Sequence, residues 1–195
     1  YTLKELLCLD AGSFYEKTDP FSQIRKGNID TAALSSFTGL KIPTLAQGLD
    51  LVKKHSWSVN LELKRHVADD AADVYLPEKT IETVKKSGLR PEQVVISSFN
   101  HIWLDHLRKT APEYSLAALM VSIPPGLRDI SKLPFQAYHL NADHTTAQDI
   151  EMLKSAGKRV CLYTVNDPDR FSGFSSLGVD AVFTDFPQLF CSPGH

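Results

Sequence analysis

Polar and apolar residues alternate strictly along residues 58–64. In an extended strand this pattern places the polar side chains on one face and the apolar ones on the other, namely Asn60, Glu62 and Lys64 against Val59, Leu61 and Leu63. A surface strand with a hydrated polar side gives the same alternation. The residues that follow favour a second interpretation, in which the polar face is the inner face of a parallel sheet or barrel.

Downstream of this strand, short apolar segments recur and each is followed by a helical pattern, as in a parallel sheet or barrel. The strands are predicted at residues 58–64, 94–99, 116–121, 137–141, 159–165 and 181–184. Helices are predicted at residues 3–9, 30–37, 45–55, 77–86, 100–109, 146–156 and 167–177. Residues 13–39 show no regular period apart from the short helix at 30–37, and form a long insertion.

Six strands that alternate with helices are two fewer than a closed eight-stranded barrel contains, and such a barrel needs about 250 residues. An open parallel sheet would expose two edges to water. The 195 residues are therefore predicted to form one domain, an incomplete α/β barrel of the TIM type. Tyr1 is not an initiator Met and precedes neither a basic segment nor an apolar signal core, so the sequence is expected to be part of a longer chain. Glu62 and Lys64 would lie at the barrel mouth, where ligands bind.

Composition excludes several classes of protein. With 43% hydrophobic and 23% charged residues, a net charge of -2 and a pI near 6.4, the chain resembles ordinary globular domains without a nucleic-acid partner. The longest apolar segment, residues 115–123, is shorter than the ~20 residues of a membrane-spanning helix. Cys8, Cys161 and Cys191 have no paired spacing, which indicates neither disulfides nor a zinc site and slightly favours a cytoplasmic location. The compartment and the oligomeric state stay open.

Several motifs, in order and at fitting intervals, resemble those of the glycerophosphodiester phosphodiesterase family. They lie at residues 9–13, 42–45, 60–64, 97–99, 163–166 and 178–187. The resemblance implies a TIM barrel that hydrolyses glycerophosphodiesters to an alcohol and sn-glycerol 3-phosphate with a divalent metal, Ca²⁺ or Mg²⁺. It implies a small-molecule substrate and a place in lipid and glycerol metabolism.

The sequence also departs from that family. In the family a His-Arg-Gly motif, a Glu-x-Asp pair and a later His-Asp supply the acid/base histidines and most metal-binding carboxylates, and none of these motifs occurs in the 195 residues. The first two barrel strands are accordingly expected to be missing, and the 195-residue chain to be inactive alone. The alternative is a relative that binds a phosphate-bearing or sugar ligand without cleaving it. A third possibility is another phosphodiesterase barrel, of the phosphatidylinositol phospholipase or sphingomyelinase D type, but the insertion favours a free-standing glycerophosphodiesterase.

Four residues are the predicted site. The resemblance implies that Glu62 is a metal ligand; the alternative is a salt bridge to Lys64 inside the barrel. It implies that Lys64 is a catalytic cation that stabilises charge on the phosphate; the alternative is a structural counter-ion. Phe99 and Tyr163, at strand ends, are predicted to bind substrate, although aromatic residues there often only fill the core. Tyr163 stands where the family often has Trp.

Other polar residues receive structural interpretations. The cluster His139, Asn141, Asp143 and His144 is interpreted as loop and cap residues rather than metal ligands. Asp185 is predicted to form hydrogen bonds in a tight turn. The remaining internal histidines are expected at exposed helix or loop positions, namely His55, His66, His101 and His106.

Overall fold

The computed structural model describes residues 1–66, 70, 72–124 and 133–190. The chain divides into two compact units, Tyr1–Leu51 and Val52–His195. That all 195 residues form a single domain stays a prediction. Cys191 lies outside the described residues.

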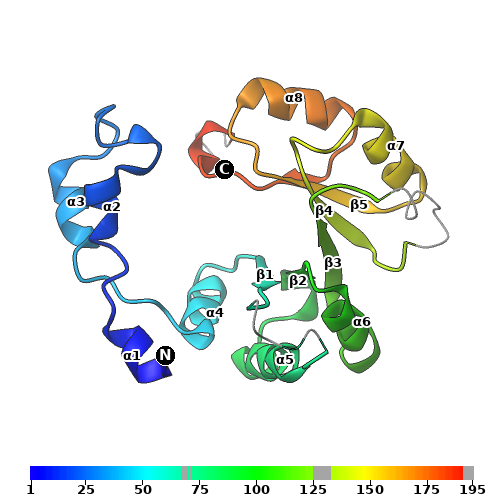
Figure 1. Cartoon of the computed structure of the whole chain (residues 1–195), viewed down its shortest axis with the longest axis horizontal. Helices are drawn as coiled ribbons and strands as arrows, with labels where there is room; N and C mark the ends of the chain where they lie inside the picture. Colours follow the sequence, from blue (N-terminus) through cyan, green and yellow to red (C-terminus); the bar gives the residue numbers. More distant parts are fainter. Residues whose placement is uncertain (67–69, 71, 125–132, 191–195) are drawn as a thin grey trace. The chain divides into compact units, whose positions relative to one another are not determined.

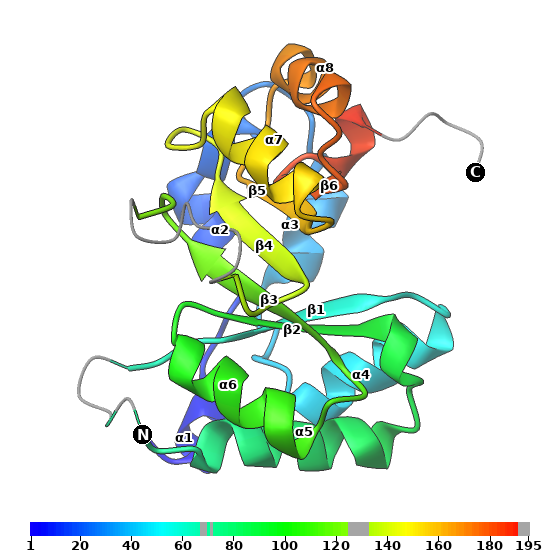
Figure 2. The same ribbon diagram turned by 90° about the vertical axis from the view of Figure 1, so that its right-hand side faces the viewer.

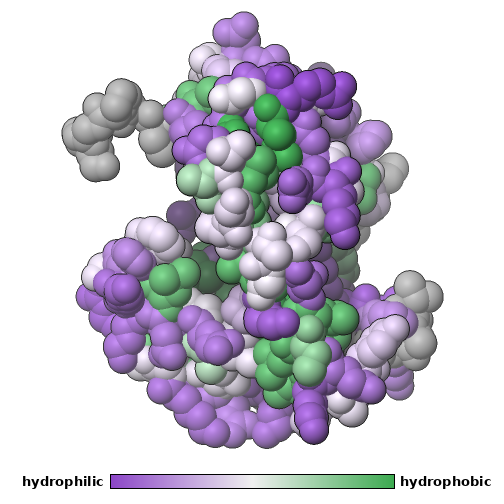
Figure 3. Space-filling view, turned by 90° about the vertical axis from the view of Figure 1, so that its left-hand side faces the viewer, coloured by the Kyte–Doolittle hydropathy of each residue, from purple (hydrophilic) through white to green (hydrophobic). Residues whose placement is uncertain are grey.

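The first unit contains three short helices, α1 (Leu3–Cys8), α2 (Phe14–Thr18) and α3 (Thr31–Phe37), together with the 3₁₀ turn η1 (Pro20–Ser22) and the larger part of α4 (Leu45–Lys54). Thr2 and Asp30 cap α1 and α3 through side-chain oxygens that accept hydrogen bonds from the first turn, so both predicted helices are confirmed. None of the three helices buries a residue. Large apolar side chains of this unit reach the surface, and hydrophobic areas lie among hydrophilic ones on the face that Figure 3 presents.

Asp10 closes the base of the 13–39 insertion. Its carboxylate accepts hydrogen bonds from the backbone N–H of Gly12, of Ser13 and, across the insertion, of Gly39 at 3.1 Å. A hydrogen bond from the Ser13 hydroxyl, together with these backbone bonds, holds the pKa of Asp10 well below its usual range. Gly12 is required here because a Cβ atom would lie 1.8 Å from the Phe37 carbonyl oxygen. The motif at residues 9–13 thus contains the residues that join the two ends of the insertion.

The second unit is built on a six-stranded sheet whose strands are all parallel and follow one another in chain order (Figures 1 and 2). The strands are β1 (Val59–Leu63), β2 (Val94–Ser98), β3 (Ser115–Met120), β4 (Ala137–Asn141), β5 (Arg159–Tyr163) and β6 (Ala181–Val182). All six predicted strands are present, with β6 shorter than expected. Sequential parallel strands joined by helices are the arrangement of a β/α barrel, of which the chain forms a part.

Helices connect most of the strands. α4 (Leu45–Lys54) precedes β1, α5 (Tyr75–Ser87) follows β1, α6 (His101–Thr110) follows β2, α7 (Ala147–Ser155) follows β4 and α8 (Pro168–Ser176) follows β5. Short 3₁₀ turns precede β2 and follow β6, namely η2 (Pro91–Gln93) and η5 (Pro187–Leu189). α6 packs on β2 and β3, and α7 packs on β5. Trp103, Leu104 and Leu107 are the buried face of α6. The helix-facing positions of the central strands are also buried, including Ile96, Leu140 and Leu162.

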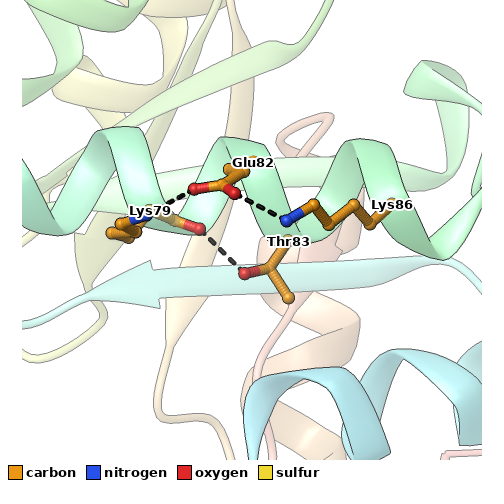
Figure 4. A network of polar contacts seen from close by, with 4 residues as sticks. All are labelled: Lys79, Glu82, Thr83 and Lys86. Atoms are coloured by element: carbon orange, nitrogen blue, oxygen red, sulfur yellow. Dashed lines mark hydrogen bonds and ion pairs between the residues drawn. The ribbon is translucent and has the colours of Figure 1, made fainter.

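Local sequence explains why these helices form where they do, and α5 is the clearest case. Pro77 lies near its start, Gly88 ends it with a φ of 72°, and Glu82 forms ion pairs with both Lys79 and Lys86 at 2.6 Å on the exposed face (Figure 4). The two ammonium groups lower the pKa of Glu82 to about 2.

The sheet curves toward the face opposite these helices. The rings of Phe99 and Tyr163, which follow β2 and end β5, lie 6.2 Å apart although two strands separate β2 from β5. Neighbouring strands are about 4.8 Å apart, so a flat sheet would place these strands about 14 Å apart. The contact therefore identifies the concave, inner face, and the carboxyl ends of the strands form its open end.

Candidate functional site

Glu62 lies on the inner face near the carboxyl end of β1, as its alternation predicts. On the same face, the Asn60 Nδ2 donates to Ser97 Oγ at 3.1 Å, which joins β1 to β2 below Glu62. The Glu62 side chain is 32% exposed and that of Lys64 is 78% exposed. Their closest N–O distance of 3.8 Å makes a loose ion pair, which constrains neither group strongly and leaves both accessible to a ligand.

Phe99 and Tyr163 form an aromatic pair beside this carboxylate. The rings meet edge to face at 85°, and Tyr163 Oη donates a hydrogen bond to the Met120 carbonyl oxygen at 3.0 Å. Burial raises the pKa of Tyr163, and the negative charge of Glu62 raises it further. The hydroxyl of Tyr163 is thus engaged by the protein, whereas the ring of Phe99 is 51% exposed.

A cavity of about 650 Å³, here called the mouth cavity, opens at the carboxyl ends of β1 and β2. It is lined by Glu62, Leu63, Lys64, Arg65, Phe99, Asn100, His101 and Ile102. Three of the four predicted site residues line it, and the fourth, Tyr163, contacts Phe99. Their roles as metal ligand, catalytic cation and substrate-binding residues stay predictions.

Sequence reasoning missed the part of the mouth cavity that the first turn of α6 contributes. Asn100 caps α6 by accepting a hydrogen bond from the backbone N–H of Ile102 at 3.2 Å, and this fixes the direction in which residues 100–102 leave β2. The available signal was position alone: these residues directly follow a buried parallel strand, at the end of the sheet where ligands bind.

Two expectations about histidines are wrong. His101 and His106 are half-buried rather than exposed, because His101 contacts the Leu119 carbonyl oxygen and His106 lies 3.2 Å from Glu78. His139 is not a loop residue: it belongs to β4 and is only 3% exposed, in edge contact with Phe183. Burial and the nearby charge of Arg159 lower its pKa from 6.5 to about 4.

The other members of the polar cluster fit the structural interpretation. Asn141 Oδ1 accepts a hydrogen bond from the backbone N–H of Asp143 at 2.8 Å in the turn after β4, and Asp143 forms an ion pair with Arg170 at 2.9 Å. His144 is exposed in the same turn.

Asn166 joins the ends of β5 and β6 at the open end of the sheet. Its Nδ2 donates to Asp185 Oδ2 at 2.8 Å, and its Oδ1 accepts hydrogen bonds from Thr184 Oγ1 and from the backbone N–H of Asp185. The predicted turn role of Asp185 is confirmed, and the partner of that turn is Asn166, to which sequence reasoning gave no role.

The described residues do not form a metal site by themselves. Ca²⁺ takes six to eight oxygen ligands and Mg²⁺ takes six. Glu62 is the one carboxylate that lines the mouth cavity, and the described part of the chain contains no group of three or more His, Cys, Asp or Glu side chains that could hold a metal ion. Further ligands would have to come from the ligand, from water or from residues beyond the described ones.

A family comparison decides between the barrels that the motifs left open. The model of the glycerophosphoryl diester phosphodiesterase family matches residues 1–189. The chain belongs to this family. The match covers the site and the 13–39 insertion alike, so other phosphodiesterase barrels are no longer needed to explain the motifs.

Individual relatives agree with this family. The chain is 29% identical to a glycerophosphodiester phosphodiesterase of Caldanaerobacter subterraneus subsp. tengcongensis over 96% of its own length and 69% of the relative's. It is 27% identical to the uncharacterized protein YqiK of Bacillus subtilis, over 89% and 71%. Among solved structures, an Oleispira antarctica phosphodiesterase in complex with the product sn-glycerol-3-phosphate superposes with a TM-score of 0.78 at 25% identity, over 96% of this chain and 68% of that one.

None of the described helices is long and apolar enough to cross a membrane.

Proposed function

We propose that this chain carries part of the active site of a phosphodiesterase that hydrolyses glycerophosphodiesters to an alcohol and sn-glycerol 3-phosphate. The observation that carries the proposal is the convergence of Glu62, Lys64 and Phe99 on one cavity at the carboxyl end of a parallel sheet in a member of this family. A cavity of about 650 Å³ is within the range of small-molecule sites. The neighbour that binds sn-glycerol-3-phosphate supports a ligand of this class.

In this reaction water adds to phosphorus, and the bond from phosphorus to the alcohol oxygen breaks. The alcohol oxygen leaves with the bonding electrons and takes up a proton, while the proton of the attacking water is released. Lys64 would stabilise negative charge on the phosphoryl oxygens, which is greatest as the bonds change. Phe99, whose ring contacts that of Tyr163 edge to face, would cover the apolar part of the substrate and exclude water from it.

The proposal includes a divalent metal, Ca²⁺ or Mg²⁺, to which Glu62 contributes a carboxylate. A bound divalent cation would supply charge stabilisation for the phosphate. Calorimetric titration of Ca²⁺ and Mg²⁺ into the wild-type chain and into Glu62→Gln measures this directly. Loss of binding in the variant is expected, and equal binding by both proteins would contradict the assignment.

Activity is proposed to require residues that the 195-residue sequence does not contain, because the motifs that supply the acid/base histidines in this family do not occur in it. The proposed barrel likewise lacks the strands that would carry them. The same absence favours the second candidate function, a relative that binds a phosphate-bearing or sugar ligand without cleaving it.

Phosphorus NMR separates the two functions. The assay follows glycerophosphocholine with Ca²⁺ or Mg²⁺ in the presence of the protein that contains this chain. Appearance of sn-glycerol 3-phosphate, lost in Lys64→Met, is expected for the enzyme. Ligand binding with no product at any protein length would favour the non-catalytic relative.

A further inference from the structure

His101 lies in the mouth cavity, and the reaction proposed above gives it no task. It is the first residue of α6, directly after the cap residue Asn100 and two residues after Phe99. Of the histidines that the structure describes, it alone lines this cavity together with Glu62 and Lys64.

Two contacts hold its ring. Nε2 lies 3.1 Å from the carbonyl oxygen of Leu119, at the end of β3, and the ring meets Phe135 edge to face at 5.8 Å. A carbonyl oxygen can only accept a hydrogen bond, so Nε2 carries the proton and donates it. In the neutral imidazole the other nitrogen, Nδ1, then holds a lone pair and can only accept. The contact with Leu119 therefore favours the tautomer in which Nδ1 is the hydrogen-bond acceptor that the ring offers to a ligand.

The charges around the ring restrict which ligand it can serve. Lys64, which is 78% exposed, places a positive charge at the mouth cavity and attracts the phosphate of a diester. The quaternary ammonium group of choline has no hydrogen-bond donor to offer to Nδ1. Phe99 and Ile102 are 51% and 53% exposed and offer apolar surface to a carbon skeleton. Hydroxyl groups on such a skeleton need an acceptor, and Nδ1 is one.

We propose that His101 accepts a hydrogen bond from a hydroxyl of the alcohol of the bound phosphodiester, and thereby makes the mouth cavity selective for esters of polyols over esters of choline. This inference rests on the proposed function, since it specifies the substrate class of the same site. The side chain is a specificity residue and takes no part in breaking the bond to phosphorus.

Binding of glycerophosphoglycerol and glycerophosphocholine, measured by titration calorimetry in the presence of Ca²⁺, tests the inference. The two probes share the glycerophosphate group and differ in the hydroxyls and the charge of the second alcohol. His101→Phe removes both nitrogens and keeps a ring against Phe135. His101→Gln keeps an N–H for Leu119 and a carbonyl oxygen for the ligand. His106→Phe, on the same helix beside Glu78, is the matched control, and circular dichroism verifies that each variant folds.

The wild-type chain is expected to bind glycerophosphoglycerol about tenfold more tightly than glycerophosphocholine, which corresponds to one hydrogen bond. His101→Phe should reduce this ratio severalfold by weakening only the polyol ester, His101→Gln should restore most of it, and His106→Phe should leave it unchanged.

The inference would be overturned if His101→Phe left the ratio of the two affinities unchanged, including the case in which it weakened binding of both diesters equally. The proposed function would be unaffected by that result. Tighter binding of glycerophosphocholine by the wild type would overturn it too, since the exposed ring of Phe99 would then bind the ammonium group. Binding of neither diester would overturn this inference, whereas the proposed function is decided separately by the phosphorus NMR assay on the protein that contains this chain.

Discussion

Lys64 is 78% exposed at the end of β1 and makes only a loose contact with Glu62, so its charge is available to a phosphate. Replacing it by Gln keeps a polar side chain of similar reach and removes the charge. An exposed ion pair contributes little, so we expect affinity for sn-glycerol 3-phosphate to fall by about two- to fivefold, and less at high salt. Titration calorimetry measures the change. Lys109→Gln, on α6 outside the mouth cavity, is the control, and an equal loss in both variants would contradict a specific role.

His139 predicts a pH dependence of stability. Its folded-state pKa of about 4 lies below the ordinary value of 6.5, so below pH 6.5 the unfolded chain binds a proton more readily than the folded one. The free energy of unfolding should be unaffected above pH 6.5 and fall as the pH drops toward 4, by up to about 3 kcal/mol. Urea denaturation of the wild type and of His139→Leu across this range measures it. If the free energy of unfolding fell equally with pH in both proteins, the loss of stability would be due to groups other than His139.

The sequence predicts single residues well where one strand decides their position. Alternation alone places Glu62 on the inner face, and Phe99 follows from its place at a strand end. His101 and His139 could not be placed this way, because their environments are made by residues far along the chain: the carbonyl of Leu119 for one, Phe183 and Arg159 for the other.

The ends of β5 and β6 are held together by the side chain of Asn166, which makes three hydrogen bonds to Thr184 and Asp185. Asn166→Ala removes all three and leaves the Asp185 side chain without this donor. We expect the free energy of unfolding to fall by about 2 kcal/mol, because the bonds lie at a partly exposed sheet end. Urea denaturation is the measurement. Ser172→Ala, which removes one local bond within α8, should cost less than about 0.5 kcal/mol.

Elements were predicted in proportion to the strength of their pattern. β1 was found from its alternation, and most of the other strands because buried parallel strands are continuous apolar segments. For α5, Gly88 marks the end as predicted, whereas the helix begins at Tyr75, two residues before the predicted start at Pro77. α2 was missed because a helix of five residues is too short for a period to emerge, and it buries no side chain that would impose one. β6 is shorter than predicted, since its regular pairing with β5 ends at Val182, although Phe183 still donates to the Leu162 carbonyl oxygen and accepts from the backbone N–H of Val165.

On the scale of the whole molecule, the sheet begins and ends with strands that have one neighbour each. Within the described residues, β1 pairs only with β2 and β6 only with β5. Glu62 lies near the carboxyl end of β1, and Asn166 follows β5. We propose that the acid/base groups of the active site belong to residues outside these 195.

This arrangement makes a prediction about catalysis. The 195-residue polypeptide should bind Ca²⁺ or Mg²⁺ weakly and release no sn-glycerol 3-phosphate from glycerophosphocholine, because the motif histidines that are proposed to transfer the protons do not occur in its sequence. A longer polypeptide, with the family's His-Arg-Gly and Glu-x-Asp motifs placed before Tyr1, should turn over the same substrate. Phosphorus NMR follows both reactions under identical conditions, and a version of the longer chain with Ala in place of the motif histidine is the control. Turnover by the 195 residues alone would show that the described residues contain a complete catalytic set, in which case His101 would be the first group to test as the acid or base.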